Sequence, residues 1–222
     1  MKNKQEKLLK ICQEYLEPFG FDLMKPFNVH QYNNLYSNPK NQLKNFPERK
    51  EKENTLGILF GNTKNLWKPF MKEFDLNLKN ELNPLDKYTE NVFYSLQKKL
   101  GNEKSFIKFS HDVLDGEVIS IQKICQISGL AYNEESIGLC IHEKFGPWFA
   151  LRCVLVFDED FNEDVHQITK FPGSNEDLIN MRNEMKQALK TGNWLNIRNC
   201  CKLGEEFKYT KEQIDYHYFR KI

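Results

Sequence analysis

The chain has 222 residues, with 32 basic against 31 acidic side chains and a formal net charge of +1. A chain of this length fits one domain, residues 1–222, whose core is large enough to need no disulfide or structural metal. The near-balance of charge argues against a broad nucleic-acid surface, which needs a basic excess on one face. The aromatic fraction of 13% is high for so polar a chain and predicts a large core or a pocket for a flat ligand.

Two further classes of protein are excluded by the sequence. The N-terminal residues contain no apolar segment of the kind that a secretory signal needs. No run approaches the roughly 18–20 apolar residues of a membrane span. The six cysteines show no zinc-binding spacing, and Cys200 and Cys201 are adjacent and too strained for an ordinary disulfide. We therefore expect reduced thiols, a cytoplasmic protein and no metal held by protein side chains.

The residue pattern in the N-terminal quarter of the chain predicts two helices and a loop. Apolar residues at three- and four-residue spacing indicate a helix over residues 4–16, ended by Pro18 and Gly20. A second short helical pattern follows Pro26, with these candidate positions: Phe27, His30, Gln31 and Leu35. Residues 37–54 are polar, with two prolines and a run of charges, which predicts an exposed loop or a flexible insert.

The rest of the chain mixes strands and helices without a regular alternation. The predicted strands span residues 55–61, 106–109, 136–142 and 148–157. The predicted helices span residues 64–74, 84–100, 117–128, 175–190 and 211–218. Residues 143–147 suit a hairpin turn with one residue at positive φ, and Thr210 with Gln213 suits a capping box. The pattern predicts an α+β domain with a largely antiparallel central sheet flanked by helices.

Arg152 is the first candidate for a functional side chain, because it lies within a strand of otherwise apolar residues. Alternation places Trp148, Ala150 and Arg152 on one face, and Phe149, Leu151 and Cys153 on the other. A buried arginine needs a carboxylate partner, which belongs either to the protein or to a ligand. The pattern by itself favours an internal ion pair.

Other candidates are weaker, and their structural interpretations remain open. Trp194 and Arg198 lie close together and suit either core or edge packing of the ring, or an anion site formed by the stacking ring and the guanidinium. His142 and Cys140 lie near the end of a strand, where a structural histidine and an inert thiol are the commoner roles. Gln122, with Gln126 four residues later, suits either a polar contact inside an apolar pocket or a solvent-facing pair.

Several blocks of residues resemble the cytosolic cobalamin-processing proteins of the CblC type, the methylmalonic aciduria and homocystinuria type C family. The central block contains Cys140-Ile141-His142, Phe145-Gly146, Trp148-Phe149-Ala150 and Arg152. The flanking blocks are Pro18-Phe19-Gly20-Phe21, Pro26-Phe27, Tyr32-Asn33, Lys68-Pro69-Phe70, Ile119 with Gln122, Gly129, Ala131-Tyr132, and Tyr209 with Glu212-Gln213 and Tyr216. They follow one another in consistent order over roughly residues 15–218.

The resemblance implies a fold like the flavin-dependent nitroreductases, adapted to hold cobalamin with its lower base detached from cobalt. It implies removal of the upper ligand, by transfer of alkyl groups to glutathione or by reductive loss of cyanide. The implied electron source is reduced FMN or FAD, supplied by NADPH or a flavoprotein reductase. The implied partners are a second cobalamin-trafficking protein and methionine synthase or its reductase, with the protein a monomer or a ligand-induced homodimer. The alternatives are a cobalamin chaperone without turnover or a general flavin reductase.

The resemblance also implies roles for individual residues. Arg152 and Arg198 are the implied anchors for the carboxylates of glutathione, with Arg220 a third candidate. The implied cobalamin contacts are Ile119, Ser120, Ile121, Gln122, Asn133, Cys140, Leu151 and Trp194. No histidine is needed as a cobalt ligand. The sequence departs from the family pattern at Gln126, where vertebrate relatives have histidine, in the shortened 132–137 loop, and at Pro147 in place of glycine.

Overall fold

A computed structural model describes residues 4–49, 53–101, 105–113, 116–164 and 167–221. Its central feature is a four-stranded antiparallel sheet in the order β1-β2-β6-β3. These strands are β1 (Leu23–Asn28), β2 (Thr55–Asn62), β3 (Ser105–Phe109) and β6 (Ala150–Asp160). A separate antiparallel pair joins β4 (Tyr132–Glu134) to β5 (Leu139–Ile141). The prediction of an α+β domain with an antiparallel central sheet is confirmed.

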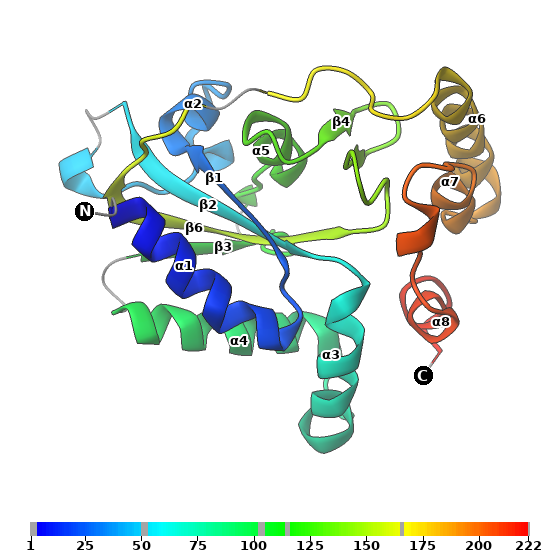
Figure 1. The fold of residues 1–222 in the computed structure, drawn as a ribbon, viewed down its shortest axis with the longest axis horizontal. Helices are drawn as coiled ribbons and strands as arrows, with labels where there is room; N and C mark the ends of the chain where they lie inside the picture. Colours follow the sequence, from blue (N-terminus) through cyan, green and yellow to red (C-terminus); the bar gives the residue numbers. More distant parts are fainter. Residues whose placement is uncertain (1–3, 50–52, 102–104, 114–115, 165–166, 222) are drawn as a thin grey trace.

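Helices cover both faces of this sheet (Figure 1). The helices are α1 (Lys4–Leu16), α2 (Val29–Asn33), α3 (Trp67–Glu73), α4 (Pro84–Leu100), α5 (Ile121–Ile127), α6 (Asn175–Thr191), α7 (Leu195–Asn199) and α8 (Lys211–Phe219). In Figure 1, α1 and α4 lie on one side of the sheet and α2 and α5 on the other, while α6, α7 and α8 gather at one end. Of the described helices, none has the length and apolar character required to traverse a bilayer.

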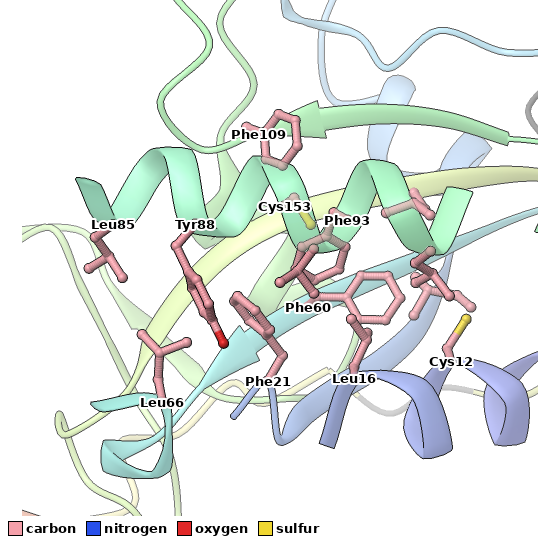
Figure 2. Close-up of a cluster of buried hydrophobic side chains, with 14 of the residues drawn as sticks. Cys12, Leu16, Phe21, Phe60, Leu66, Leu85, Tyr88, Phe93, Phe109 and Cys153 are labelled. Atoms are coloured by element: carbon pink, nitrogen blue, oxygen red, sulfur yellow. The ribbon is translucent and has the colours of Figure 1, made fainter. Parts of the chain in front are cut away.

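The larger core lies between the sheet and the α1–α4 layer, and it absorbs much of the aromatic surplus. Figure 2 shows Phe21, Phe60 and Phe93 pointing toward one another from a loop, a strand and a helix. The ring centroids of Phe93 lie 4.9 Å from Phe21 and 5.2 Å from Phe60, both in edge-on contact. Edge-on pairs are a favoured geometry for aromatic rings, so these contacts fix the packing as well as burying apolar area.

The second core lies on the opposite face of the sheet, beneath α2 and α5. Alternation along β6 sends Val154 and Val156 to this side, whereas Leu155 and Phe157 face the α4 side. Tyr32 is fully buried here, and its hydroxyl donates to the carbonyl of Asn41 and accepts the Ser120 amide. The central part of β6 is therefore covered on both faces.

The predicted helices over residues 4–16 and 84–100 are confirmed at both ends by α1 and α4. The short helix predicted after Pro26 is wrong in its start, because Pro26 and Phe27 lie in β1 and the helix begins only at Val29. Phe27 pairs with Gly57 of β2, and a Cβ at Gly57 would lie 2.4 Å from the Phe27 ring. The ring therefore occupies the space that this glycine leaves, which tertiary packing decides and local pattern does not reveal.

Two predictions about the extent of segments need correction. The helix predicted over 117–128 is shorter, because the Ser120 side chain caps the N-terminus of α5 and the residues before Ser120 are not helical. The expectation of an exposed 37–54 loop is wrong for Leu43, Phe46 and Arg49, which are buried. The Arg49 guanidinium donates to Asp158 at 2.5 Å and to Asp160 at 2.6 Å, so this charged segment is fastened to β6.

The hairpin predicted for residues 136–157 is also wrong in its pairing. β5 pairs with β4, and β6 pairs with β2 and β3, so the two predicted strands are not neighbours. The turn between them closes through one bridge from His142 to Gly146, and Gly146 has the expected positive φ, at 53°. A Cβ at Gly146 would lie 1.8 Å from the Leu203 carbonyl oxygen, so the turn packs directly on the chain before α8.

The capping box predicted at the start of α8 forms only in part. The Thr210 hydroxyl accepts the Gln213 amide at 3.3 Å, as expected of a cap. The Gln213 side chain is fully buried instead, and neither of its polar atoms has a partner among the described residues. An amide left in this state is unfavourable, because it has lost water without gaining a hydrogen bond.

Candidate functional site: an arginine cavity beside the α5 wall

Arg152 lies in an irregularity of β6. The β2–β6 ladder pairs Phe60 with Cys153 and Gly61 with Leu151, which leaves Arg152 as an extra residue, a β-bulge. Cys153 consequently belongs to the α4-side core, whereas Leu151 packs against the α5-side core. The prediction that these two residues share a face is wrong, because the bulge reverses the alternation at this point.

The Arg152 side chain has an amide partner instead of a carboxylate. Its Nε donates to Asn62 Oδ1 at 2.6 Å, and Asn62 Nδ2 donates to the Thr63 carbonyl at 2.8 Å. No ion pair joins Arg152 to a carboxylate within the part of the chain that the structure describes. Burial lowers the pKa of the Arg152 guanidinium, which nonetheless stays charged at neutral pH. The internal ion pair that the pattern favoured is therefore absent from these residues.

Arg152 lines a cavity of about 460 Å³ between the start of α4 and the end of α8. Asp86 lies on the α4 side, and Tyr216, His217 and Arg220 line it from α8 and its C-cap. Arg220 has a left-handed backbone, with φ at 51°. The structure thus brings two of the three implied arginine anchors to one cavity, and Arg220, the weakest of the three from sequence, is one of them.

Arg198 occupies a different position from the other two arginines. Its Nη1 donates to the Pro147 carbonyl and, at 3.3 Å, to the Phe149 carbonyl. Its guanidinium lies 6.0 Å from the centre of the Tyr209 ring. These contacts fasten α7 to the chain that leads into β6. The structure gives Arg198 a structural role in addition to any part in binding.

His217 is a strongly perturbed titratable group at this cavity. Burial, followed by the charges of Arg152 and Arg198, lowers the pKa of its imidazole to about 3. The ring lies 5.6 Å from Tyr209, 5.4 Å from Tyr216 and 6.5 Å from Trp67, measured between centroids. At neutral pH this histidine is an uncharged hydrogen-bonding group among cations.

Most of the implied cobalamin contacts gather on the α5 side of the sheet. Ile119 and Ile121 are buried in the α5-side core, and Leu151 packs against it. The Ser120 side chain accepts the Lys123 amide and so begins α5. The Gln122 carbonyl accepts a weak bond from the Cys140 thiol at 3.8 Å. The structure therefore brings six positions to one surface beside α5, which we call the α5 wall: Ile119, Ser120, Ile121, Gln122, Cys140 and Leu151. The two isoleucine side chains are largely covered.

The remaining two implied contacts differ from each other. Asn133 is buried in β4 directly opposite Cys140 of β5, so it joins the α5 wall. Trp194 precedes α7 and is 46% exposed, and its ring stacks on no aromatic side chain in the described ranges. Trp194 therefore does not lie in the core, and packing at an edge of the domain stays a prediction.

Sequence reasoning missed two residues of this site: His217, which lines the arginine cavity, and Asn62, the buried partner of Arg152. Asn62 ends β2, and its side-chain oxygen accepts the Arg152 Nε. His217 carried no local signal beyond its place in a predicted helix. The hydrogen bond between Asn62 and Arg152 joins residues that are 90 positions apart in the sequence. No spacing rule detects such a pair.

Comparison with known proteins defines first the fold and then the family. A solved structure of a C. elegans B12-trafficking protein, CblC, described as a human MMACHC homologue, matches with a TM-score of 0.72. The match covers 98% of this chain and 92% of the other, at 16% sequence identity, so it establishes the shared fold. Residues 20–221 match the Methylmalonic aciduria and homocystinuria type C family, and the chain belongs to that family. A search among curated proteins gave no match.

Proposed function

We propose that this protein processes cobalamin, by removing its upper axial ligand. Alkyl groups pass to glutathione, and cyanide is lost reductively. Membership of the type C family supports the cobalamin assignment, since this is a family of cobalamin-processing proteins. The observation that carries the thiol assignment is Arg152, a cation in a cavity without a protein carboxylate partner among the described residues. Glutathione has two carboxylates, which arginine binds well because its donors form a planar fork.

The β6 bulge explains how the two substrates can meet. Leu151 faces the α5 wall and Arg152 faces the arginine cavity, so consecutive residues of one strand contact both regions. We propose that cobalamin lies along the α5 wall, contacting the stretch from Ile119 to Gln122 together with Cys140. Glutathione then occupies the cavity with Arg152 and Arg220 at its carboxylates. Nothing in this arrangement requires a histidine on cobalt.

The decisive test is anaerobic incubation with methylcobalamin and glutathione while the visible spectrum of the corrin is recorded. We expect faster demethylation than in protein-free buffer, and a spectrum on binding that reports loss of the lower base. Binding without faster demethylation would instead identify a cobalamin chaperone. Tight flavin binding without cobalamin binding would identify a flavin reductase.

Arg152→Ala tests the anchor itself. Loss of one charge-assisted contact costs on the order of 1.5–3 kcal/mol, which is roughly a 10- to 150-fold loss of apparent glutathione affinity. Cobalamin binding is expected to change little, because the guanidinium faces away from the α5 wall. Lys186→Ala, an exposed change on α6, is the matched control. Equal glutathione dependence in Arg152→Ala and the control would refute the role.

Decyanation needs electrons that glutathione transfer does not supply. We propose that they come from reduced FMN or FAD, regenerated by NADPH or a flavoprotein reductase in the cytoplasm, and we assign no residue to the flavin. The cobalamin product would pass to a second trafficking protein. Cyanocobalamin incubated anaerobically with reduced FMN, with and without the protein, measures this activity separately from dealkylation.

A further inference from the structure

His217 faces the arginine cavity with no protein partner for its nitrogens among the described residues. It lines the same cavity as Arg152 and Arg220, and rings of Trp67, Tyr209 and Tyr216 surround it. Within the described ranges its imidazole makes no hydrogen bond or ion pair, whereas the His111 ring is paired to two carboxylates. A half-buried imidazole in this state is available to a polar group of whatever occupies the cavity.

The charges around His217 determine what it can do. Arg152 faces it from β6, and Arg198 lies on the α7 side. Tyr216 accompanies it on α8, and Arg220 lies at the C-cap of that helix. The cavity wall contributes the further charges of Lys79, Glu81 and Asp86. Burial, followed by the charges of Arg152 and Arg198, keeps the imidazole neutral in the absence of a bound anion. A ligand with two carboxylates would neutralise the arginines and raise the proton affinity of the ring.

We propose that His217 accepts the thiol proton of glutathione bound in this cavity. The inference rests on the proposed dealkylation. The S–H proton passes to an imidazole nitrogen, and the resulting thiolate forms the S–C bond with the alkyl group of cobalamin. The electron pair of the broken Co–C bond stays with cobalt, and the proton leaves His217 for solvent after the thioether departs. Carboxylate binding and proton acceptance are thereby coupled, so a thiol without carboxylates gains little from His217.

His217→Phe preserves the ring packing and removes the acceptor. A general base contributes roughly 10²- to 10⁴-fold, so we expect kcat with glutathione at pH 7 to fall by about 100-fold or more. The apparent glutathione affinity should change by less than about 3-fold, since the arginines remain. Near pH 9.5 solution thiolate replaces the acceptor, and the deficit should shrink to about 10-fold or less. His30→Gln, on α2, is the control and should match the parent.

The outcomes separate this inference from the proposed function. A parent protein without glutathione-dependent demethylation refutes the function itself. An active parent with a His217→Phe variant of equal kcat at both pH values refutes only the role of His217. His217→Gln gives a second variant if the phenylalanine form fails to bind cobalamin. NMR titration of the parent with S-methylglutathione provides a measurement without any variant: the His217 pKa should rise from about 3, and an unchanged value overturns the coupling.

Discussion

Asn62→Asp separates the charge of Arg152 from its position. Asn62 is fully buried, and its side-chain oxygen accepts the Arg152 Nε at 2.6 Å. Aspartate keeps an oxygen at that place and adds a negative charge, so the guanidinium becomes ion-paired. Its second oxygen replaces the amide that donates to the Thr63 carbonyl, and the loss of that bond lowers the stability of the variant, which the unfolding measurement reports. If Arg152 serves as an anion anchor, this substitution cancels the charge that the anchor supplies.

The size of the effect follows from the geometry. A ligand carboxylate on the open side of the guanidinium would lie roughly 6 Å from the carboxylate introduced at position 62, and at an effective dielectric constant of about 20 the two charges repel by about 3 kcal/mol. Water in the cavity reduces this to about 1.5–2 kcal/mol, because the cavity opens to solvent. We therefore expect glutathione affinity to weaken roughly 10- to 30-fold.

The assay is the initial rate of methylcobalamin demethylation at increasing glutathione concentration, with cobalamin binding and thermal unfolding measured on the same samples. Asn62→Ala is the comparison, because it removes the acceptor and leaves Arg152 charged. It should lower the free energy of unfolding by about 1.5–3 kcal/mol through loss of a bond to a charged group. An aspartate variant that binds cobalamin and keeps the parental glutathione affinity would show that the charge of Arg152 is not used.

Four other substitutions test the packing and the electrostatics by chemical or thermal unfolding. Phe93→Ala should cost about 3–5 kcal/mol, because this fully buried ring contacts two others; a cost under about 1 kcal/mol would contradict that packing. Gly146→Ala should cost about 2–3 kcal/mol, since its Cβ would clash with a backbone carbonyl oxygen; parental stability would refute the close approach. Gln213→Met should stabilise by about 1 kcal/mol, and destabilisation would reveal a hydrogen bond to its amide. Burial raises the pKa of Glu134, but hydrogen bonds from Ser136 and Arg182 outweigh burial, so the pKa in the folded protein is lowered. The ionised Glu134 carboxylate therefore stabilises the folded state above about pH 4.3, the usual pKa of glutamate, and this stabilisation is lost as the pH falls through the lowered pKa. Arg182→Met should flatten that loss below pH 5 by about 1 kcal/mol, and an unchanged pH profile would refute the assignment.

The sequence pattern was sufficient to predict an element where the residues of that element determine its ends. The helix α4 has Pro84 in its first turn and an amphipathic repeat, and its prediction is confirmed at both ends. The strand β1 shows why other elements were missed. Its Pro26 and Asn28 are poor strand formers, and the strand exists because it forms the edge of the sheet and, among the described strands, pairs only with β2. That pairing joins residues 28 to 38 positions apart, which no local window contains.

The candidate site shows the same limit in a sharper form. The sequence identified Arg152 as an arginine in need of an anion, because an isolated charge in an apolar strand is costly. It assigned the partner by base rate, and the structure reverses that assignment by supplying the neutral amide of Asn62. The position of Arg152 depends on the bulge in β6, because strict alternation would have kept its two neighbours, Leu151 and Cys153, on one face. Because of this extra residue, Leu151 packs toward the α5 wall while Arg152 lines the arginine cavity. It follows that deleting the bulge should damage both regions together, whereas Arg152→Ala should affect only the cavity.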